Sequence, residues 1–326
     1  MTDVCWPERD HSVAPWRTIH NRVAGCTPDP TVHGTPGDAP APTPATRSDE
    51  AEAVATWVSG FADVVGGVAA SSTNWGADET QVQWLAALQS QCAAHLSRVD
   101  TADPVIGGPT VFPAPSAPAS AAPSPETVEE ALAAVAAGVA DGLPVLRAAI
   151  ASDTDGAARL FHASMATAAT GSLNPARPPV EGGAEPSPFP DPDPATALDM
   201  ALTYVWVLIR GLELGLGRLP RESDLQESGR LRLDSAKTLR NELLAALTGD
   251  PPEVDTWNLP NAMSTTDEIR TAWAELEVGV LDALGVLVAS GEPEWAAWLD
   301  AMLAQVPWVH QWGGRLPHWP GWVAKP

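Results

Sequence analysis

Four glutamates in the second half of the chain are the residues best suited by type to metal chemistry: Glu213, Glu242, Glu275 and Glu277. Helical bundles hold two metal ions with inward glutamates and Glu-x-x-His pairs, because residues three apart lie on one helix face. Glu275 and Glu277 are two residues apart, so they cannot both face a core. Glu277 follows the apolar Leu276, at the border of the expected buried face.

Glu277 is therefore the best candidate ligand, followed by Glu275 and the weaker Glu213. A glutamate is rarely buried without a partner, so we favour a solvated flank over a metal ligand at Glu277. The Glu-x-x-His at Glu8–His11 precedes any helical pattern, and no helix of the second half offers an inward histidine. We expect no cofactor. The alternative is a di-iron or di-manganese site, which needs at least three of the four glutamates to converge.

Other catalytic patterns are missing from the sequence. Cys92 and His95 have an i, i+3 spacing, but zinc takes about four ligands and no second pair accompanies them. We predict a buried Cys92 beside an exposed His95. The sequence has no G-x-S-x-G elbow and no P-loop, and the glycines of 211–217 belong to a helix end. The sequence thus favours a protein that is not an enzyme.

Tryptophans crowd the C-terminal region. Four of them, Trp308, Trp312, Trp319 and Trp322, are candidates for a binding surface. On this hypothesis they form an exposed aromatic patch for a protein, a glycan or a membrane interface. On the alternative, the Pro-rich tail folds back over the helices and buries them. We favour burial, because large aromatic side chains usually find it.

The N-terminal region contains a candidate lipidation site. Val23-Ala24-Gly25-Cys26 matches the small-residue core of a bacterial lipobox, and a Pro/Thr-rich tether follows Cys26. A working signal also needs an apolar segment before the cysteine, and residues 16–22 are too polar. A decayed signal, a different native start and a chance match all remain open. Lipidation would place the protein at the cell envelope, whereas the start as given favours the cytoplasm.

Composition excludes some partners. The chain of 326 residues is 44% hydrophobic and carries a formal net charge of −23, which repels nucleic acid and anionic lipid headgroups. We find no run of about 20 apolar residues and predict no transmembrane segment. The three cysteines do not suggest a disulfide framework.

Apolar residues at helical spacing predict an all-α protein of eight helices. Pro-rich segments divide the chain into a disordered leader (1–47), a helical bundle (48–171, with a linker at 101–124), a second linker (172–192), a second bundle (193–312) and a Trp/Pro-rich tail (313–326). The two sets of four helices form either two bundles or one larger composite. Helix starts are predicted at Ser124-Pro125, at Asp193-Pro194 and at a capping box spanning 265–268.

Residues 194–312 resemble an actinobacterial ferritin-like family of unknown function. The features that carry the resemblance are an Ala/Leu-rich helix ending at Gly211, the element Trp257-Asn258-Leu259-Pro260, Leu276-Glu277 and the closing Trp312. The resemblance implies a four-helix bundle and a secreted or lipid-anchored location. Where the family tends to have metal ligands, this chain has Thr203-Tyr204 and Ala236, and only Glu277 remains.

These observations favour a non-catalytic, ferritin-like helical protein of the cell envelope that binds an unknown protein or small ligand. One alternative is a metal-binding or oxidase protein with unusual carboxylate ligands. Another is a cytoplasmic interaction protein that uses its Trp-rich C-terminal surface. No sequence pattern indicates the oligomeric state.

Overall fold

The structure, a computed structural model, describes residues 46–112, 123–252, 259, 263–291 and 293–323. Within these ranges it has eight α-helices, and its β-structure is limited to isolated bridges. The all-α prediction is confirmed for this part of the chain. The helices are α1 (Asp49–Ala70), α2 (Glu79–Val99), α3 (Val128–Ser152), α4 (Gly156–Gly171), α5 (Pro194–Arg218), α6 (Leu225–Ala246), α7 (Thr266–Ala289) and α8 (Trp295–Gln311).

Local side-chain chemistry sets several helix starts. Asp193 caps α5 by accepting a hydrogen bond from the Thr196 N–H, and Pro194 occupies the first turn. The predicted capping box is present at the start of α7, from Thr265 to Glu268. The predicted start at Ser124-Pro125 is wrong, because α3 begins three residues later behind the N-cap Thr127. Similarly, α5 continues past Gly211 to Arg218, so that glycine lies inside the helix.

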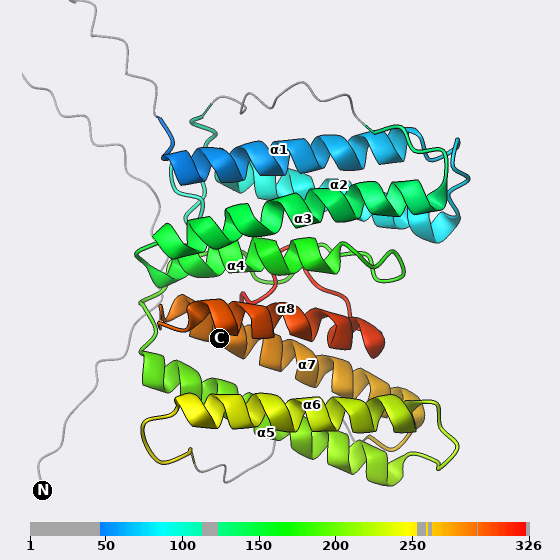
Figure 1. Cartoon of the computed structure of the whole chain (residues 1–326), viewed down its shortest axis with the longest axis vertical. Coiled ribbons are helices and arrows are strands. Elements are labelled where there is room, and N and C mark those ends of the chain that lie inside the picture. The colour runs from blue at the N-terminus through cyan, green and yellow to red at the C-terminus, as the bar shows by residue number, and fades with distance from the viewer. Residues whose placement is uncertain (1–45, 113–122, 253–258, 260–262, 292, 324–326) are drawn as a thin grey trace, which may run out of the picture. The chain divides into compact units, whose positions relative to one another are not determined.

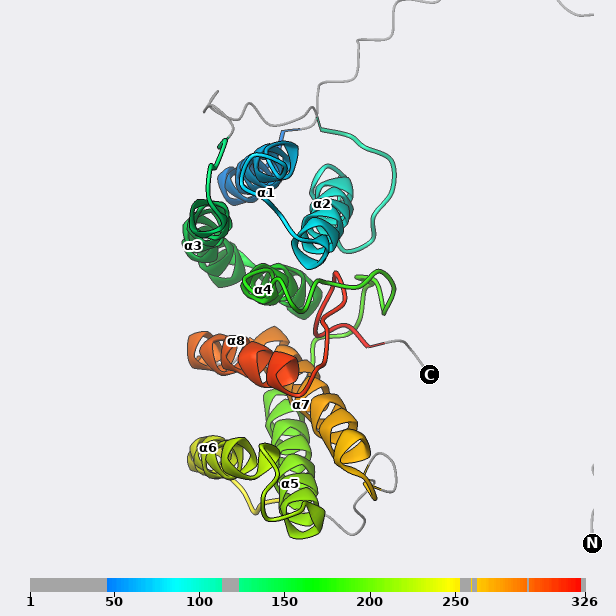
Figure 2. The same ribbon diagram turned by 90° about the vertical axis from the view of Figure 1, so that its right-hand side faces the viewer.

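One core cluster extends across both sets of helices, and a second, smaller cluster lies mainly among α1, α2 and α3. Helix α1 contacts both α2 and α3, and α3 contacts α4. In the second set α5 contacts both α6 and α7, and α7 contacts α8. In both ribbon views α4 lies between the first helices and the α7–α8 pair (Figures 1 and 2). Its Phe161 and Met165 are fully buried in a cluster that extends from α1 to α8. This continuity favours the composite arrangement over two separate bundles.

The buried face of α2 includes Leu85, Leu88 and Cys92. Val82 and Gln89 are exposed, whereas Trp84 and Leu88 are buried. The Trp84 indole Nε1 donates a hydrogen bond to the carbonyl of Ser172, the C-cap of α4, at 2.9 Å. The prediction of an exposed His95 is wrong, because its ring packs against Trp319 and contacts the His318 carbonyl, while Cys92 is buried as expected.

The C-terminal residues 312–323, here called the strap, return across helices from both sets (Figure 2). The Val180 N–H donates to the Leu316 carbonyl, and the His95 ring lies 2.9 Å from the His318 carbonyl oxygen. Trp319 stacks on Phe161 with ring centroids 5.2 Å apart. The strap thereby joins α2 and α4 to the second set of helices.

Three helices, α1, α3 and α5, are long and apolar enough to cross a membrane, judged by length and composition alone. Their high mean hydropathy reflects many alanines and valines in α1 and α3 and many leucines in α5. In the structure each presents a stripe of buried residues to neighbouring helices. The absence of a transmembrane segment therefore stays a prediction.

Asp282 on α7 lies beneath the strap and should make stability depend on pH. Its Oδ1 accepts a hydrogen bond from the Gly321 N–H at 3.2 Å. Burial raises the pKa of Asp282 to about 7, and the hydrogen bond only partly opposes this. Because the folded-state pKa exceeds the unfolded value of about 3.9, the folded state binds the proton more tightly. This contribution to stability is complete below about pH 4 and is lost as the pH rises through about 7.

We therefore expect Asp282→Asn to stabilise the protein at pH 8 by about 2–4 kcal/mol and to change little at pH 4. Urea unfolding of both proteins at each pH measures the difference. The comparison must be made at each pH, since burial lowers the pKa of His95 and of His310 to about 4 and weakens both proteins in acid. An equal gap at pH 4 and pH 8 would contradict the assignment to Asp282.

Candidate functional site: a buried ion pair beneath a groove

The inward face of α6 carries a charged residue. The buried positions of this helix recur at heptad-like spacing through Leu225, Gly229, Arg232, Ala236 and Leu239. Such a stripe faces the core, so the Arg232 side chain must enter it. Only 1% of Arg232 is exposed. A buried guanidinium needs a negatively charged partner, and that partner lies on α7.

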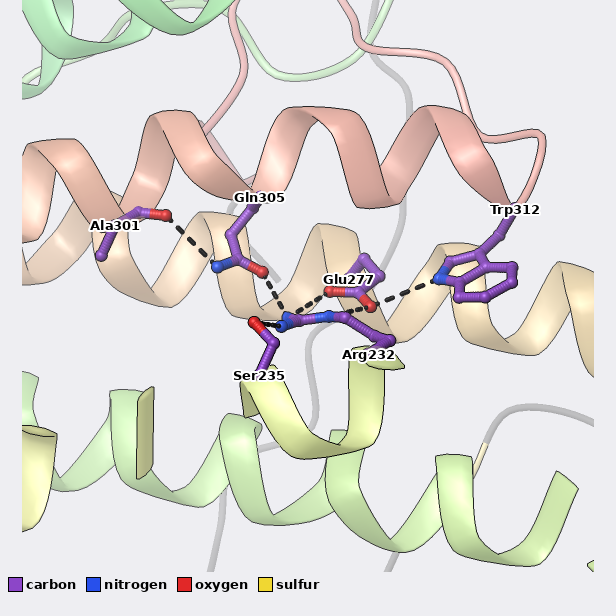
Figure 3. A network of polar contacts seen from close by, with 6 residues as sticks. All are labelled: Arg232, Ser235, Glu277, Ala301, Gln305 and Trp312. Atoms are coloured by element: carbon purple, nitrogen blue, oxygen red, sulfur yellow. Dashed lines mark hydrogen bonds and ion pairs between the residues drawn. The ribbon is translucent and has the colours of Figure 1, made fainter. Parts of the chain in front are cut away.

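The partner is Glu277, which is fully buried at 0% exposure. Arg232 Nε donates to Glu277 Oε1 at 2.7 Å, and Arg232 Nη2 donates to Oε2 at 2.7 Å. The Trp312 indole Nε1 also donates to Oε1, at 3.3 Å. Figure 3 shows Arg232 meeting Glu277 between α6 and the α7–α8 pair. The prediction of a solvated flank at Glu277 is wrong, and the reason is this partner 45 residues away.

Two further side chains complete the network around the guanidinium. Nη2 also donates to Gln305 Oε1 at 2.6 Å, and Nη1 donates to Ser235 Oγ at 3.1 Å. Gln305 is held in turn by donating from Nε2 to the Ala301 carbonyl within α8. Four of the five guanidinium N–H groups thus have partners from three helices.

Burial and the ion pair act on Glu277 in opposite directions. Burial raises the pKa of Glu277, while the hydrogen bonds and the charge of Arg232 lower it. The geometry itself is that of a carboxylate, because both oxygens accept hydrogen bonds from the same planar fork. Both oxygens are therefore engaged within the protein.

Tryptophans enclose the pair. The Arg232 Cζ atom lies 5.2 Å from the centre of the Trp308 ring, within range of a cation–π contact. Trp273 packs edge-on against Trp312 at 4.8 Å and donates from Nε1 to the Gly211 carbonyl at 3.0 Å. A Cβ atom at Gly215 would lie within 2.7 Å of the Trp273 indole, so a glycine is needed there.

A groove lies over this network, between α6 and α8. Its volume is about 380 Å³. The lining residues are Arg232, Ser235, Thr238, Leu239 and Glu242 from α6, and Ala301, Ala304, Gln305 and Trp308 from α8. Arg232 and Gln305 are buried and form its floor, whereas Ser235, Thr238 and Glu242 are exposed at its rim.

The four candidate glutamates do not converge. Glu277 is buried in the ion pair, and Glu213 is half-exposed, 3.9 Å from both Arg210 and Lys237. Glu275 is exposed on α7, and Glu242 is exposed on the groove rim. Among the described residues, no group of three or more His, Cys, Asp or Glu side chains is placed to hold a metal ion.

The four C-terminal tryptophans do not form an exposed patch. Trp312, Trp319 and Trp322 are buried, and Trp308 is half-buried against the Arg232 network. This arrangement is the alternative we favoured, in which the tail folds back over the helices. The lipidation candidate Cys26 lies outside the described residues.

The sequence did not lead us to predict Arg232 or Gln305 as residues of the site. A usable signal existed at Arg232, which occupies an inward position of α6 between Gly229 and Ala236. A charged residue in such a stripe indicates a buried partner. Gln305 gave no comparable signal.

Comparison with family models, with curated proteins and with solved structures finds no match to this chain. Of the element Trp257–Pro260 that supports the ferritin-like resemblance, only Leu259 is among the described residues. The resemblance therefore stays a prediction.

Proposed function

We propose that this chain is a non-catalytic helical binding protein, built on a ferritin-like bundle in which an internal ion pair replaces a metal centre. The observation that supports this most is the bidentate pairing of Glu277 with Arg232. Among the described residues Glu277 is the one buried glutamate, and inward glutamates are the residues with which helical bundles hold metal. Its negative charge is already balanced by a guanidinium.

Metal binding at this point would have to break the pair. A metal ion that took the Glu277 oxygens would leave Arg232 buried and uncompensated, at a cost of about 3–5 kcal/mol. The incoming ion would also lack other ligands, because Glu213, Glu242 and Glu275 are exposed or half-exposed. The pair thus supports a binding role over metal-dependent oxidation or metal storage.

The location and the partners belong to the same proposal. A lipid anchor at Cys26 would hold the protein at the cell envelope, with the eight described helices in water and none of them spanning the membrane. Arg210, Glu213 and Arg218 in the C-terminal half of α5 support this reading, since charges are costly at the centre of a bilayer. We take the partner to be a small ligand rather than nucleic acid, which the net charge of −23 would repel.

Elemental analysis tests the proposal. The full chain is purified from cells supplied with iron and manganese, together with Glu277→Gln and the exposed control Glu275→Gln. We expect less than about 0.1 transition-metal ion per chain in all three proteins, because Arg232 supplies the balancing cation. About two ions per chain in the wild type, reduced by Glu277→Gln and not by Glu275→Gln, would overturn it and favour a di-metal oxidase.

A further inference from the structure

The groove between α6 and α8 has the features of a small-molecule site. Each of these helices packs mainly on another neighbour, α6 on α5 and α8 on α7, which leaves the space between them unfilled. The volume of about 380 Å³ falls in the range of about 300–1,000 Å³ that small-ligand sites occupy. The side chains that form the walls and the floor of the groove indicate which class of ligand would fit.

The floor offers two hydrogen-bond donors without partners among the described residues. Arg232 Nη1 has two N–H groups and donates only to Ser235 Oγ. Gln305 Nε2 likewise has two and donates only to the Ala301 carbonyl. Arg232 is 1% and Gln305 3% exposed, and both line the groove. Buried donors are normally satisfied, so these two indicate an acceptor that enters from the groove.

The rim adds groups that can both donate and accept. Ser235 and Thr238 contribute hydroxyls, and Glu242 contributes a carboxylate. They follow each other along one face of α6 at i, i+3 and i+7 spacing. On the opposite wall, Ala301 and Ala304 are small and leave room for a ligand. Trp308 provides an aromatic edge at one end.

Charge narrows the ligand class. The Arg232 and Glu277 charges cancel, so among the residues that line the groove the net charge comes from Glu242, which disfavours an anionic ligand. The two floor groups are N–H donors, which disfavour a cation lying directly above them. A ligand with several hydroxyls satisfies the donors, the rim hydroxyls and the carboxylate together.

We propose that this groove binds a neutral, hydroxyl-rich small molecule of monosaccharide size. The ligand oxygens accept from Arg232 Nη1 and Gln305 Nε2, and a ligand hydroxyl donates to Glu242. The inference rests on the proposed binding function and assigns it a place and a ligand class. It is independent of the elemental analysis, because a chain without metal could still leave this groove empty.

Three sugars of similar size and different charge test the ligand class on the full chain. Ligand-observed NMR titrations use D-glucose, which is neutral, D-glucosamine, which is cationic, and D-glucuronate, which is anionic. We expect glucose to bind saturably and glucuronate to bind roughly tenfold more weakly, because of repulsion by Glu242. No saturable binding of any of the three, or tightest binding of glucosamine or glucuronate, would overturn the proposal.

Substitutions test whether the ligand binds in the groove between α6 and α8. Ala304→Trp should fill the groove and abolish glucose binding, whereas Ala296→Trp should not, because Ala296 is also exposed on α8 but lies outside the lining. Glu242→Gln and Thr238→Val should each weaken binding by about fivefold, as expected for one lost hydrogen bond. Glucose binding that survives Ala304→Trp would overturn the groove assignment. Metal in the wild-type protein would instead overturn the proposed function, so the two failures are distinguishable.

Discussion

Arg232→Ala is expected to lower the free energy of unfolding by about 3–5 kcal/mol, because it leaves Glu277 buried and without its counter-charge. The substitution removes both charge-assisted hydrogen bonds, of 2.7 Å each, and leaves Gln305 Oε1 without the donor it has in the structure. It also opens a space beside Trp308. Urea unfolding at neutral pH, followed by circular dichroism, measures the loss.

A double variant separates the unpaired charge from the lost volume. In Arg232→Met/Glu277→Leu both charges are replaced by apolar groups of similar size, so no buried charge is left alone. We expect this protein to be more stable than Arg232→Ala and within about 2 kcal/mol of the wild type. A double variant no more stable than Arg232→Ala would mean that packing, rather than charge, explains the effect.

An exposed ion pair provides the matched control. Arg210 is 56% exposed and lies 3.9 Å from Glu213. Such pairs contribute about 0–1 kcal/mol, so Arg210→Ala should change stability by no more than that. A loss at Arg210 equal to that at Arg232 would contradict the view that burial makes the Arg232 pair costly to break.

Local pattern was enough to predict the helices and some of their ends. The Asp193 cap and the Thr265–Glu268 box are decided by residues within four positions of each other, so their sequences specify them. The buried face of α2 also involves distant residues, since Trp84 on this face donates to a carbonyl 88 residues away. Periodicity alone could not choose between the face of Val82 and the face of Trp84.

In the candidate site, too, some features follow from the local sequence and others depend on residues far apart in the chain. Glu277 was recognised as lying at the border of a buried face, which periodicity can show. Whether Glu277 is solvated or buried depends on Arg232, which lies on α6, and on Gln305, which lies on α8 and accepts a hydrogen bond from Arg232. No spacing rule connects residues 45 and 73 positions apart. The inward position of Arg232 in the α6 stripe was the one local clue, and pairing it with Glu277 required the structure.

Removing the tail, residues 313–326, is expected to destabilise the protein by more than about 5 kcal/mol, since loss of one buried tryptophan alone costs about 3–5 kcal/mol. The deletion removes Trp319 and Trp322, both buried, and uncovers the Phe161 ring on which Trp319 stacks. It also removes the His318 carbonyl that contacts the His95 ring. Urea unfolding and near-ultraviolet circular dichroism of the truncated chain measure the effect.

Single substitutions show whether burial of the strap is the cause. Trp319→Ala should cost about 3–5 kcal/mol, whereas Val323→Ala, 66% exposed, should stay within about 0.5 kcal/mol of the wild type. A truncated chain that keeps the wild-type unfolding midpoint would contradict the structural role and return these tryptophans to candidates for partner binding. Because the strap contacts helices of both sets, its loss should also weaken the junction at α4, which the first and second halves of the chain share.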